Sequence, residues 1–311
     1  MADYLVTGVG GFIGAAVAAR LLSEGHHVVG VDNLTTGYPE NIPAGTEFFR
    51  ADCQDAGLYA RLPLRSYAAI LHIAGQSSGE ISFDDPVYDL RTNAESTLHL
   101  LKFALKTGCK RLVYASTMSV YGMHPDCPAK EEDPCFPHSF YGVGKLASEH
   151  YLRLYEQYGV SSAALRLFNV YGPGQNMANL RQGMVSIFMA MMLAGNHIQV
   201  KGSPDRYRDF VYIDDVVNAF MLCLEKPTVS GVFNIGGSGK VTVGELLEKM
   251  AALHPTQPVI EFAGSTAGDI PGIYADISRA AASLDYAPKV SLQDGLARMY
   301  AWAAKAMAAK R

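Results

Sequence analysis

A tyrosine, a lysine and a threonine are the residues of this 311-residue chain best suited to moving a proton. Tyr141 and Lys145 are four residues apart and follow Ser139, a residue type that often starts a helix, so a helix here places both on one face. Using a phenolate as a base at pH 7 requires lowering the pKa of a phenol by about 3 units, or roughly 4 kcal/mol. One cation about 4 Å away supplies that much at an effective dielectric constant near 20. We interpret Tyr141 as a candidate base and Lys145 as the residue that lowers its pKa.

Thr117 completes this group. The segment 113–122, VYASTMSVYG, begins as a buried strand and ends in a cluster of hydroxyl side chains. Open α/β sheets bind ligands at the carboxyl ends of their strands. We therefore expect Thr117 to hold a substrate oxygen there and to relay its proton to Tyr141.

A glycine-rich turn near the N-terminus predicts a dinucleotide site. The segment 7–14, TGVGGFIG, follows a predicted strand at 3–7 and leads into a predicted helix at 15–23. In this context Gly8 permits a tight turn, Gly11 lets the backbone approach a pyrophosphate, and Gly14 lets the helix pack closely on the strand. The helix N-terminus then presents free N–H groups and a positive dipole end to the phosphates.

Acidic residues after the next two strands indicate which dinucleotide binds. Asp32 ends a predicted strand at 27–32, where a carboxylate accepts hydrogen bonds from the adenosine ribose. The following residues, 33–37, carry no cation to neutralise a 2′-phosphate, so NAD is favoured over NADP. Asp52, after a third predicted strand, is a candidate for the adenine edge, with a solvated loop carboxylate as the alternative.

The order of the predicted elements explains how these residues are brought together. Short apolar strands alternate with helices, which predicts an α/β fold: a Rossmann-type, doubly wound parallel sheet with a smaller, interwoven C-terminal substrate-binding lobe. We expect residues 1–168 with 211–236 to form the NAD-binding domain, and residues 169–210 with 237–311 to form the smaller lobe. Beyond those given above, the expected strands are 68–74, 111–116, 163–168 and 231–235, and the expected helices are 87–107, 141–158, 184–194, 242–253 and 291–308.

Composition excludes several functional classes. The formal net charge is −4 and no basic run stands out, so we expect no nucleic-acid partner. No apolar run approaches the length of a membrane span and no secretory leader precedes the first strand, so we expect no membrane partner. The five cysteines are scattered and odd in number, which fits a reduced, cytoplasmic protein.

These motifs resemble those of the extended short-chain dehydrogenases/reductases, in particular the NAD-dependent sugar-nucleotide epimerases and dehydratases of the UDP-glucose 4-epimerase type. The resemblance spans essentially the whole chain. It implies NAD as cofactor, a nucleotide-diphosphate sugar as substrate, and a homodimer formed through the helices near 87–107 and 141–158. The motifs that carry it are TGVGGFIG (7–14), HIAG (72–75), YASTMSVYG (114–122), YGVGK (141–145), LFNVYGPGQ (167–175), RDFVYIDDVV (208–217) and GDI (268–270).

The resemblance also implies roles for single residues. Tyr141 matches the catalytic base, Lys145 its pKa-lowering partner and ribose ligand, and Thr117 the catalytic Ser/Thr. Asn169 and Arg208 match ligands of the substrate diphosphate, a group that arginine binds well in a bidentate manner. The other expected substrate contacts are Thr117, Lys201 and Asp269. The residues expected to contact NAD are Gly8, Gly11, Phe12, Ile13, Gly14, Asp32, Asn33, Asp52, Cys53, Ala74, Asn93, Ser116, Tyr141 and Lys145.

The two residues after Thr117 narrow the reaction. Similar 4,6-dehydratases have Asp-Glu at these positions, and similar UDP-glucuronate decarboxylases have Glu at the second, whereas this chain has Met118 and Ser119. Epimerisation at C4 through a transient 4-keto sugar needs only a base, a hydroxyl and NAD, so we expect an enzyme of the UDP-hexose 4-epimerase type. The alternatives are an NAD(P)-dependent nucleotide-sugar reductase or dehydratase, and a non-catalytic NAD(P)-binding regulator.

One departure from the resembled family concerns the diphosphate. Similar UDP-galactose 4-epimerases have an arginine just before GDI, and this chain does not, so Arg181 in segment 176–183 is a candidate replacement. Glu80, Asp84 and Asp85 are candidates for a carboxylate facing the sugar, with a solvated loop as the alternative.

Three further patterns are interpreted as structural. His72 at the end of a strand is expected to be a buried structural histidine. The segment 237–240, GSGK, lacks the remaining residues of a P-loop and is expected to be a turn. The His and Cys residues at 124, 127, 135 and 138 have zinc-like spacing, but their segment also matches the loop that precedes the catalytic tyrosine in the resembled family, so no metal is expected.

Overall fold

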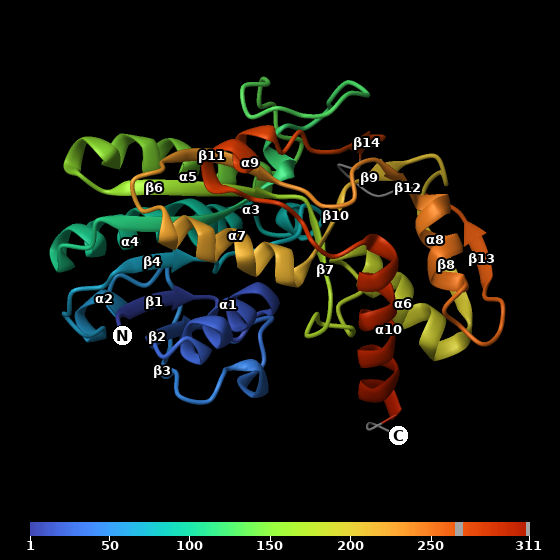
Figure 1. The fold of residues 1–311 in the computed structure, drawn as a ribbon, viewed down its shortest axis with the longest axis horizontal. Coiled ribbons are helices and arrows are strands. Elements are labelled where there is room, and N and C mark those ends of the chain that lie inside the picture. The colour runs from blue at the N-terminus through green and yellow to red at the C-terminus, as the bar shows by residue number, and fades with distance from the viewer. Residues whose placement is uncertain (265–269, 309–311) are drawn as a thin grey trace.

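A seven-stranded parallel sheet forms the centre of the computed structural model, which describes residues 1–264 and 270–308 (Figure 1). Each pair of neighbouring strands is parallel. The sheet confirms the predicted Rossmann-type, doubly wound fold. In spatial order the strands are β11 (Gly231–Ile235), β6 (Ser161–Leu167), β5 (Arg111–Thr117), β4 (Ala69–His72), β1 (Asp3–Thr7), β2 (His27–Asp32) and β3 (Glu47–Arg50).

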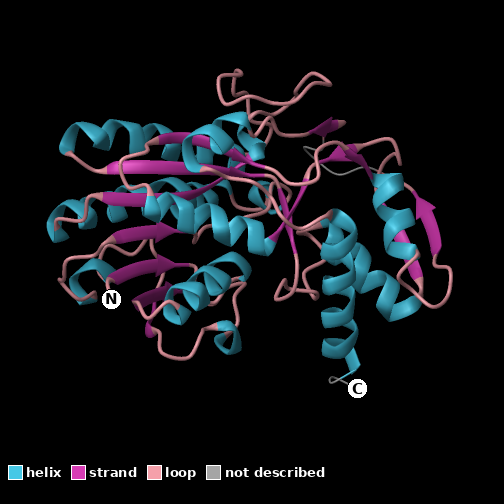
Figure 2. Ribbon diagram, viewed as in Figure 1, coloured by secondary structure: helices cyan, strands magenta, loops and turns pink. Residues whose placement is uncertain are grey.

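Helices cover both faces of this sheet because its strands are apolar on both sides (Figure 2). Consecutive residues of β1 belong to different core clusters: Leu5 packs with Leu100, and Val6 packs with Val17 and Phe220. The two clusters are therefore the two layers between sheet and helices. The helices on the Val6 face are α1 (Phe12–Ser23) and α7 (Ile213–Glu225), and those on the Leu5 face include α4 (Ser96–Thr107) and α5 (Phe140–Tyr155).

The strand order reverses between β1 and β4, and this point is the expected ligand crevice of an open α/β sheet. Thr7 at the end of β1 ties the two strand ends together. Its Oγ1 lies 2.9 Å from Nδ1 of His72 and accepts hydrogen bonds from the backbone N–H groups of Ile73 and Ala74. The loop after β4 is thereby fixed beside the glycine turn after β1.

The predicted helix at 87–107 contains a local irregularity. It begins as α3 (Pro86–Leu90), which Asp85 caps, passes through a π-helical turn at Arg91–Glu95, and continues as α4. Such π-turns are rare and occur often at functional sites.

The C-terminal half adds a smaller lobe that shares a core with the sheet. Buried residues of this lobe, such as Met189, Leu246 and Met299, belong to the same cluster as Val6 of the sheet. The methionine-rich helix at 184–195 therefore packs in the core, where flexible methionine side chains fill irregular spaces. The helices of the lobe are α6 (Met184–Gly195), α8 (Val243–Ala251) and α10 (Leu292–Ala308), and its strands are β8 (His197–Val200) with β13 (Val259–Phe262), and β9 (Tyr207–Arg208) between β12 (Val241–Thr242) and β14 (Gly272–Ile273).

The remaining elements connect these parts. β7 and β10 pair in parallel where the chain passes between the sheet and the lobe. Within residues 1–264 and 270–308, no helix is both long enough and apolar enough to span a bilayer. The bounds are β7 (Asn169–Tyr171), β10 (Phe210–Tyr212), α2 (Leu58–Arg61) and α9 (Ser278–Leu284).

Candidate active site

The glycine turn after β1 forms a cradle that side chains would fill. Gly8 has a φ of +76°, a conformation that residues with a Cβ rarely adopt. A Cβ on Gly14 would lie 2.0 Å from the Gly8 carbonyl oxygen, so α1 approaches β1 this closely only because residue 14 is glycine. The first turn of α1, starting at Phe12, thus directs its free N–H groups toward the space above the sheet edge.

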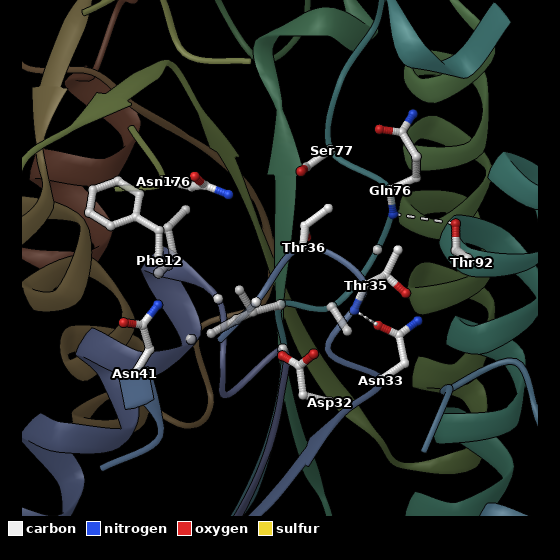
Figure 3. Close-up of a pocket in the computed structure, with 18 of the residues that line it drawn as sticks. Phe12, Asp32, Asn33, Thr35, Thr36, Asn41, Gln76, Ser77, Thr92 and Asn176 are labelled. Carbon is white, nitrogen blue, oxygen red and sulfur yellow. Dashed lines mark hydrogen bonds between the residues drawn. The ribbon is translucent and has the colours of Figure 1, made fainter. Parts of the chain in front are cut away.

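A cleft of about 280 Å³ opens at this cradle (Figure 3). Phe12 and Asn176 lie on one side of it and Gln76 on the other, so α1, the segment after β7 and the loop after β4 all contribute to its walls. The cleft runs from the end of β2 to the loop after β4, which suits an elongated dinucleotide with its pyrophosphate on α1. The expected NAD contacts that line it are Gly8, Gly11, Phe12, Ile13, Gly14, Asp32, Asn33, Asp52, Cys53 and Ala74.

The carboxylate of Asp32 shapes the adenosine end of the cleft. Its Oδ2 accepts a hydrogen bond from the Gly10 N–H at 2.9 Å, and its Oδ1 accepts one from the Leu34 N–H at 2.7 Å. Asn33 donates from Nδ2 to Asp52 Oδ2 at 2.8 Å. None of the described residues that line the cleft is a lysine or arginine. An acidic end without a cation fits a ribose with free hydroxyls better than a 2′-phosphate.

Residues from a distant segment also line the cleft, and the sequence did not identify them as site residues. Segment 172–183, after β7, contributes Asn176, Asn179 and Gln182. Gln182 donates from Nε2 to Ser77 Oγ at 2.7 Å, so the segment is fastened to the loop after β4. Its richness in Gly, Asn and Gln was the available signal.

Arg181 fastens the same segment by ion pairs. Its Nη1 lies 2.6 Å from Asp84 Oδ2, and its Nε lies 3.3 Å from Glu80 Oε1. The hydrogen bond from Arg181 lowers the pKa of the Asp84 carboxyl. The expectation that Arg181 faces the substrate diphosphate is therefore corrected: this guanidinium and the two carboxylates bind one another.

The expected catalytic residues converge at the carboxyl end of β5. Thr117 is the last residue of β5, and Tyr141 and Lys145 occupy the first turns of α5. As expected, Ser139 caps this helix by accepting a hydrogen bond from the Gly142 N–H at 3.1 Å. All three side chains are buried, so the charge of Lys145 acts on its neighbours through a medium that screens poorly.

Lys145 connects this group to the cleft. Its Nζ donates to the Ala115 carbonyl at 2.9 Å and lies 4.7 Å from the ring centroid of Tyr114 and 5.8 Å from that of Tyr141. A Cβ on Gly75, which lines the cleft, would lie only 3.4 Å from this Nζ. The ammonium therefore lies near both the Tyr141 ring and the cleft.

Burial dominates the protonation equilibria of the pair. It raises the pKa of Tyr141 to about 12, while a hydrogen bond with Thr117 lowers it. Burial lowers the pKa of Lys145 to about 8, and the charge of Asp89 opposes this decrease. A phenol in this site thus needs a nearby cation to act as a base, and Lys145 is the cation that the fold supplies.

Two expected cofactor residues lie behind this group. Asn93, in the π-helical turn, is fully buried and donates from Nδ2 to the Gln76 carbonyl at 3.0 Å. Ser116 donates instead to the buried carboxylate of Glu149, which also pairs with Arg166 at 2.8 Å. Strand alternation explains the difference, because neighbouring residues of β5 point to opposite faces. The Ser116 hydroxyl therefore serves a buried ion pair.

The expected substrate contacts are partly brought together. Asn169 donates from Nδ2 to the Asp209 carbonyl at 2.9 Å and lies 3.5 Å from Sδ of Met118, next to Thr117. Arg208 is buried and donates to the backbone carbonyls of Tyr207, Ile270 and Pro271. Lys201 follows β8 on the surface, and Asp269 lies outside the described residues.

The residues interpreted as structural lie where expected. His72 is fully buried between the hydroxyls of Thr7 and Ser96, and burial keeps its pKa well below the usual value. Segment 237–240 is a loop whose N–H groups at Gly237 and Ser238 donate to Asp209 Oδ1. His124 forms a 2.9 Å contact with Asp133 in the loop before α5.

Comparisons with known proteins agree with this geometry. A family model described as the NAD dependent epimerase/dehydratase family matches residues 4–236. The UDP-glucose 4-epimerase of Mycolicibacterium smegmatis is 36% identical over 301 residues, which cover 94% of this chain and 96% of that protein.

Solved structures show the same fold. A UDP-glucose 4-epimerase of Thermotoga maritima, solved with UDP-glucose, superposes with a TM-score of 0.92 at 34% identity and covers 98% of this chain and 99% of its own. A Thermus thermophilus UDP-glucose 4-epimerase in complex with NAD has a TM-score of 0.89 at 33% identity, with 97% and 98% covered. These findings confirm the family expected from the sequence motifs. The chain belongs to the NAD-dependent epimerase/dehydratase family.

Proposed function

We propose that this chain interconverts the C4 epimers of a UDP-hexose and retains NAD throughout the cycle. The observation that carries this proposal is the convergence of Thr117, Tyr141 and Lys145 beside the cleft, with no carboxylate at the two positions after Thr117. The related UDP-glucose 4-epimerases support the choice of substrate.

The chain's own residues account for holding the cofactor. The cradle at Gly8, Gly11 and Gly14 fits a pyrophosphate, and Asp32 fits an unphosphorylated ribose. Lys145 and Asn93 are assigned to the nicotinamide end, since both lie by the loop after β4. When bound, NAD⁺ supplies a hydride acceptor that can return the hydride to either face of a sugar carbon.

The proton chemistry falls to Tyr141 and Thr117. Tyr141 removes the proton of the 4-hydroxyl, and Thr117 holds that hydroxyl in line with the phenol. Lys145 stabilises the phenolate electrostatically and remains protonated itself. Tyr141 then returns the proton to the 4-oxygen after the sugar has presented its other face.

The diphosphate of the substrate must stay anchored while the sugar turns. We assign this role to Asn169 and Arg208, with Lys201 near the nucleotide base and Asp269 as a further contact. The assignment divides the molecule into an NAD-binding domain, residues 1–168 with 211–236, and a sugar-nucleotide-binding lobe, residues 169–210 with 237–311. Asn169 begins β7, and Arg208 ends β9, two residues before β10, the strand that pairs with β7.

We also propose a homodimer formed through the α3–α5 face. Exposed apolar side chains gather there, and the rings of Phe83 and Phe140 lie 5.4 Å apart at 72°. An apolar face of this kind is costly in water and typical of an interface. Its exposed members are Phe83, Val87, Leu90, Phe140 and Val143.

A cytoplasmic location completes the proposal. All five cysteines are free, and three of them, Cys53, Cys109 and Cys223, are buried. Free thiols persist in a reducing compartment.

The test is NMR of the purified protein with UDP-, GDP-, CDP- and dTDP-hexoses in D₂O, with no cofactor added. We expect a C4 epimer of the UDP-hexose to form without deuterium at carbon, because the hydride returns within the active site. Deuterium uptake at carbon, a 4-keto-6-deoxy product, or turnover only after NAD(P)H is added would overturn the proposal and indicate a dehydratase or a reductase.

A further inference from the structure

A buried carboxylate behind the Tyr141–Lys145 pair takes no part in the proposed proton transfer. Asp89, in α3, is fully buried. Its Oδ2 accepts a hydrogen bond from Gln76 Nε2 at 2.8 Å, whereas its Oδ1 has no hydrogen-bond partner among the described residues. Burying a carboxylate with an unpaired oxygen is costly, so such a group calls for a compensating charge nearby.

The catalytic helix provides that charge. A Cβ on Gly144 would lie 3.5 Å from Asp89 Oδ1 and 3.1 Å from Asn93 Cβ, so Asp89 and Asn93 pack directly against α5 at this position, and a larger residue would make the contact with Asn93 tight. The next residue is Lys145, and the charge of Asp89 acts on it and on Tyr141. Asp89 therefore lies behind the catalytic pair, against the face of α5 that packs on α3 and the π-helical turn.

The other ionisable groups of the elements packed against Asp89 are occupied or exposed. On α5, Glu149 is paired with Arg166. On the π-helical turn, Arg91 and Glu95 are exposed. His72, which also faces Lys145, is held neutral by burial. The Tyr141–Lys145 pair is thus the ionisable partner of Asp89.

We propose that Asp89 is a positioning residue that balances the buried charge of Lys145 and thereby sets the pH range in which the Tyr141–Lys145 pair is active. This inference rests on the proposed epimerase function. The carboxylate stabilises the ammonium of Lys145 and disfavours the phenolate of Tyr141, so it raises the pKa of both groups. Removing its charge should therefore lower the pKa of Tyr141 and of Lys145, which titrate as a coupled pair.

The experiment compares pH profiles of kcat/KM for UDP-hexose between about pH 6 and pH 10 for the NAD-loaded enzyme. In Asp89→Asn, we expect both limbs of the profile to move toward acid by about one pH unit. Asp89→Glu keeps the charge and should keep both limbs near the wild-type positions. Glu95→Gln removes an exposed charge from the neighbouring turn and should leave the profile unchanged.

A profile of Asp89→Asn that is lower at every pH but keeps both limbs in place would overturn the inference and leave Asp89 a structural residue. If this variant does not fold, Asp89→Ser removes the same charge with a smaller side chain and decides between the same outcomes.

A second readout separates this inference from the proposed function. The near-ultraviolet tyrosinate absorbance of each protein, minus that of its Tyr141→Phe counterpart, follows the ionisation of Tyr141 without any turnover. A wild-type enzyme that epimerises nothing would overturn the proposed function. The difference titration would still support the inference if Tyr141 ionises at lower pH in Asp89→Asn, and contradict it if the two titrations coincide.

Discussion

At Tyr141 the fold creates a difficulty that its neighbours must solve. Burial favours the neutral phenol, while the proposed reaction needs the phenolate. The hydrogen bond with Thr117 lowers the pKa of Tyr141 against the effect of burial. The ammonium of Lys145, 5.8 Å from the centroid of the Tyr141 ring, is the nearby cation that can stabilise a phenolate. The pair is therefore effective as a base only when both partners are present.

Tyr141→Phe should lower kcat by about 10³-fold, because it removes the proton-transferring hydroxyl while leaving the packing of α5 intact. Steady-state kinetics and the NAD content of the purified protein are the measurements. Tyr158→Phe, at an exposed tyrosine 17 positions further along the chain, is the control and should retain wild-type kcat. Retention of more than a tenth of the activity in Tyr141→Phe would argue for another base.

Lys145→Met should abolish activity and stabilise the fold. The pKa of Lys145 falls from 10.5 to about 8 on folding, so below pH 8 its buried charge costs up to about 3 kcal/mol of stability. The substitution removes this cost, but it also removes the hydrogen bond to Ala115, which offsets part of the gain. Between pH 8 and pH 10.5 the unfolded chain binds more protons at this residue, so the stability of the wild type rises with pH. Urea unfolding at matched NAD content should show Lys145→Met about 2 kcal/mol more stable at pH 7, with the difference shrinking toward pH 10. A constant difference across this range would show that the charge is not its cause.

At the scale of elements, the close contact of α1 with the end of β1 builds the cofactor site. Gly14→Ala would place a methyl group 2.0 Å from the Gly8 carbonyl oxygen, so the turn must open and the cradle is lost. We expect at least ten-fold weaker NAD binding and a loss of about 1–3 kcal/mol of stability. Calorimetric titration of the NAD-free protein measures the affinity for NAD, and urea unfolding measures the stability. Gly195→Ala, at the end of α6 with no atom within 4 Å of the added methyl group, should change neither and is the matched control.

The segment 172–183 is a second element that contributes to the cleft. Because the Arg181 ion pairs are exposed, each is worth little, and Arg181→Ala should release NAD only about two- to five-fold faster. Cofactor release into excess ADP-ribose, followed by fluorescence, gives the rate. Arg298→Ala breaks an exposed pair with Asp214 on another surface and should leave the rate unchanged. An unchanged rate in Arg181→Ala would mean that the segment stays closed without the ion pairs.

At the scale of the whole molecule, two surfaces with exposed apolar residues can be compared. Val143→Glu puts a charge on the α3–α5 face and should convert the proposed dimer to a monomer at micromolar concentration. Val259→Glu, at an equally exposed valine of β13 in the smaller lobe, should leave the dimer intact. Sedimentation equilibrium measures the oligomeric state of both variants. A wild-type protein that is monomeric would contradict the proposed dimer.

Local sequence patterns were enough to predict the sheet, the glycine cradle and the grouping of Thr117, Tyr141 and Lys145, because each depends on residues close together in the chain. The strand from Asp3 to Thr7 and the strand from Gly231 to Ile235 have the bounds that their apolar runs predict. The four-residue spacing of Tyr141 and Lys145 needs only a helix, and Ser139 starts one. Prediction was less accurate at ends and in short elements: α1 begins three residues before the predicted start, and the four-residue strands β8 and β13 were not expected.

Contacts between residues far apart in the sequence could not be predicted in this way and are seen only in the folded chain. Nothing in the sequence near Arg181 indicates that Asp84 is its partner, because the two meet only when the smaller lobe folds against the loop after β4. Likewise, the packing of Asp89 against α5 depends on how closely Gly144 lets two helical segments approach. Local sequence patterns specify which backbone a segment adopts, whereas the partner of a buried charge is specified by the packing of the whole chain.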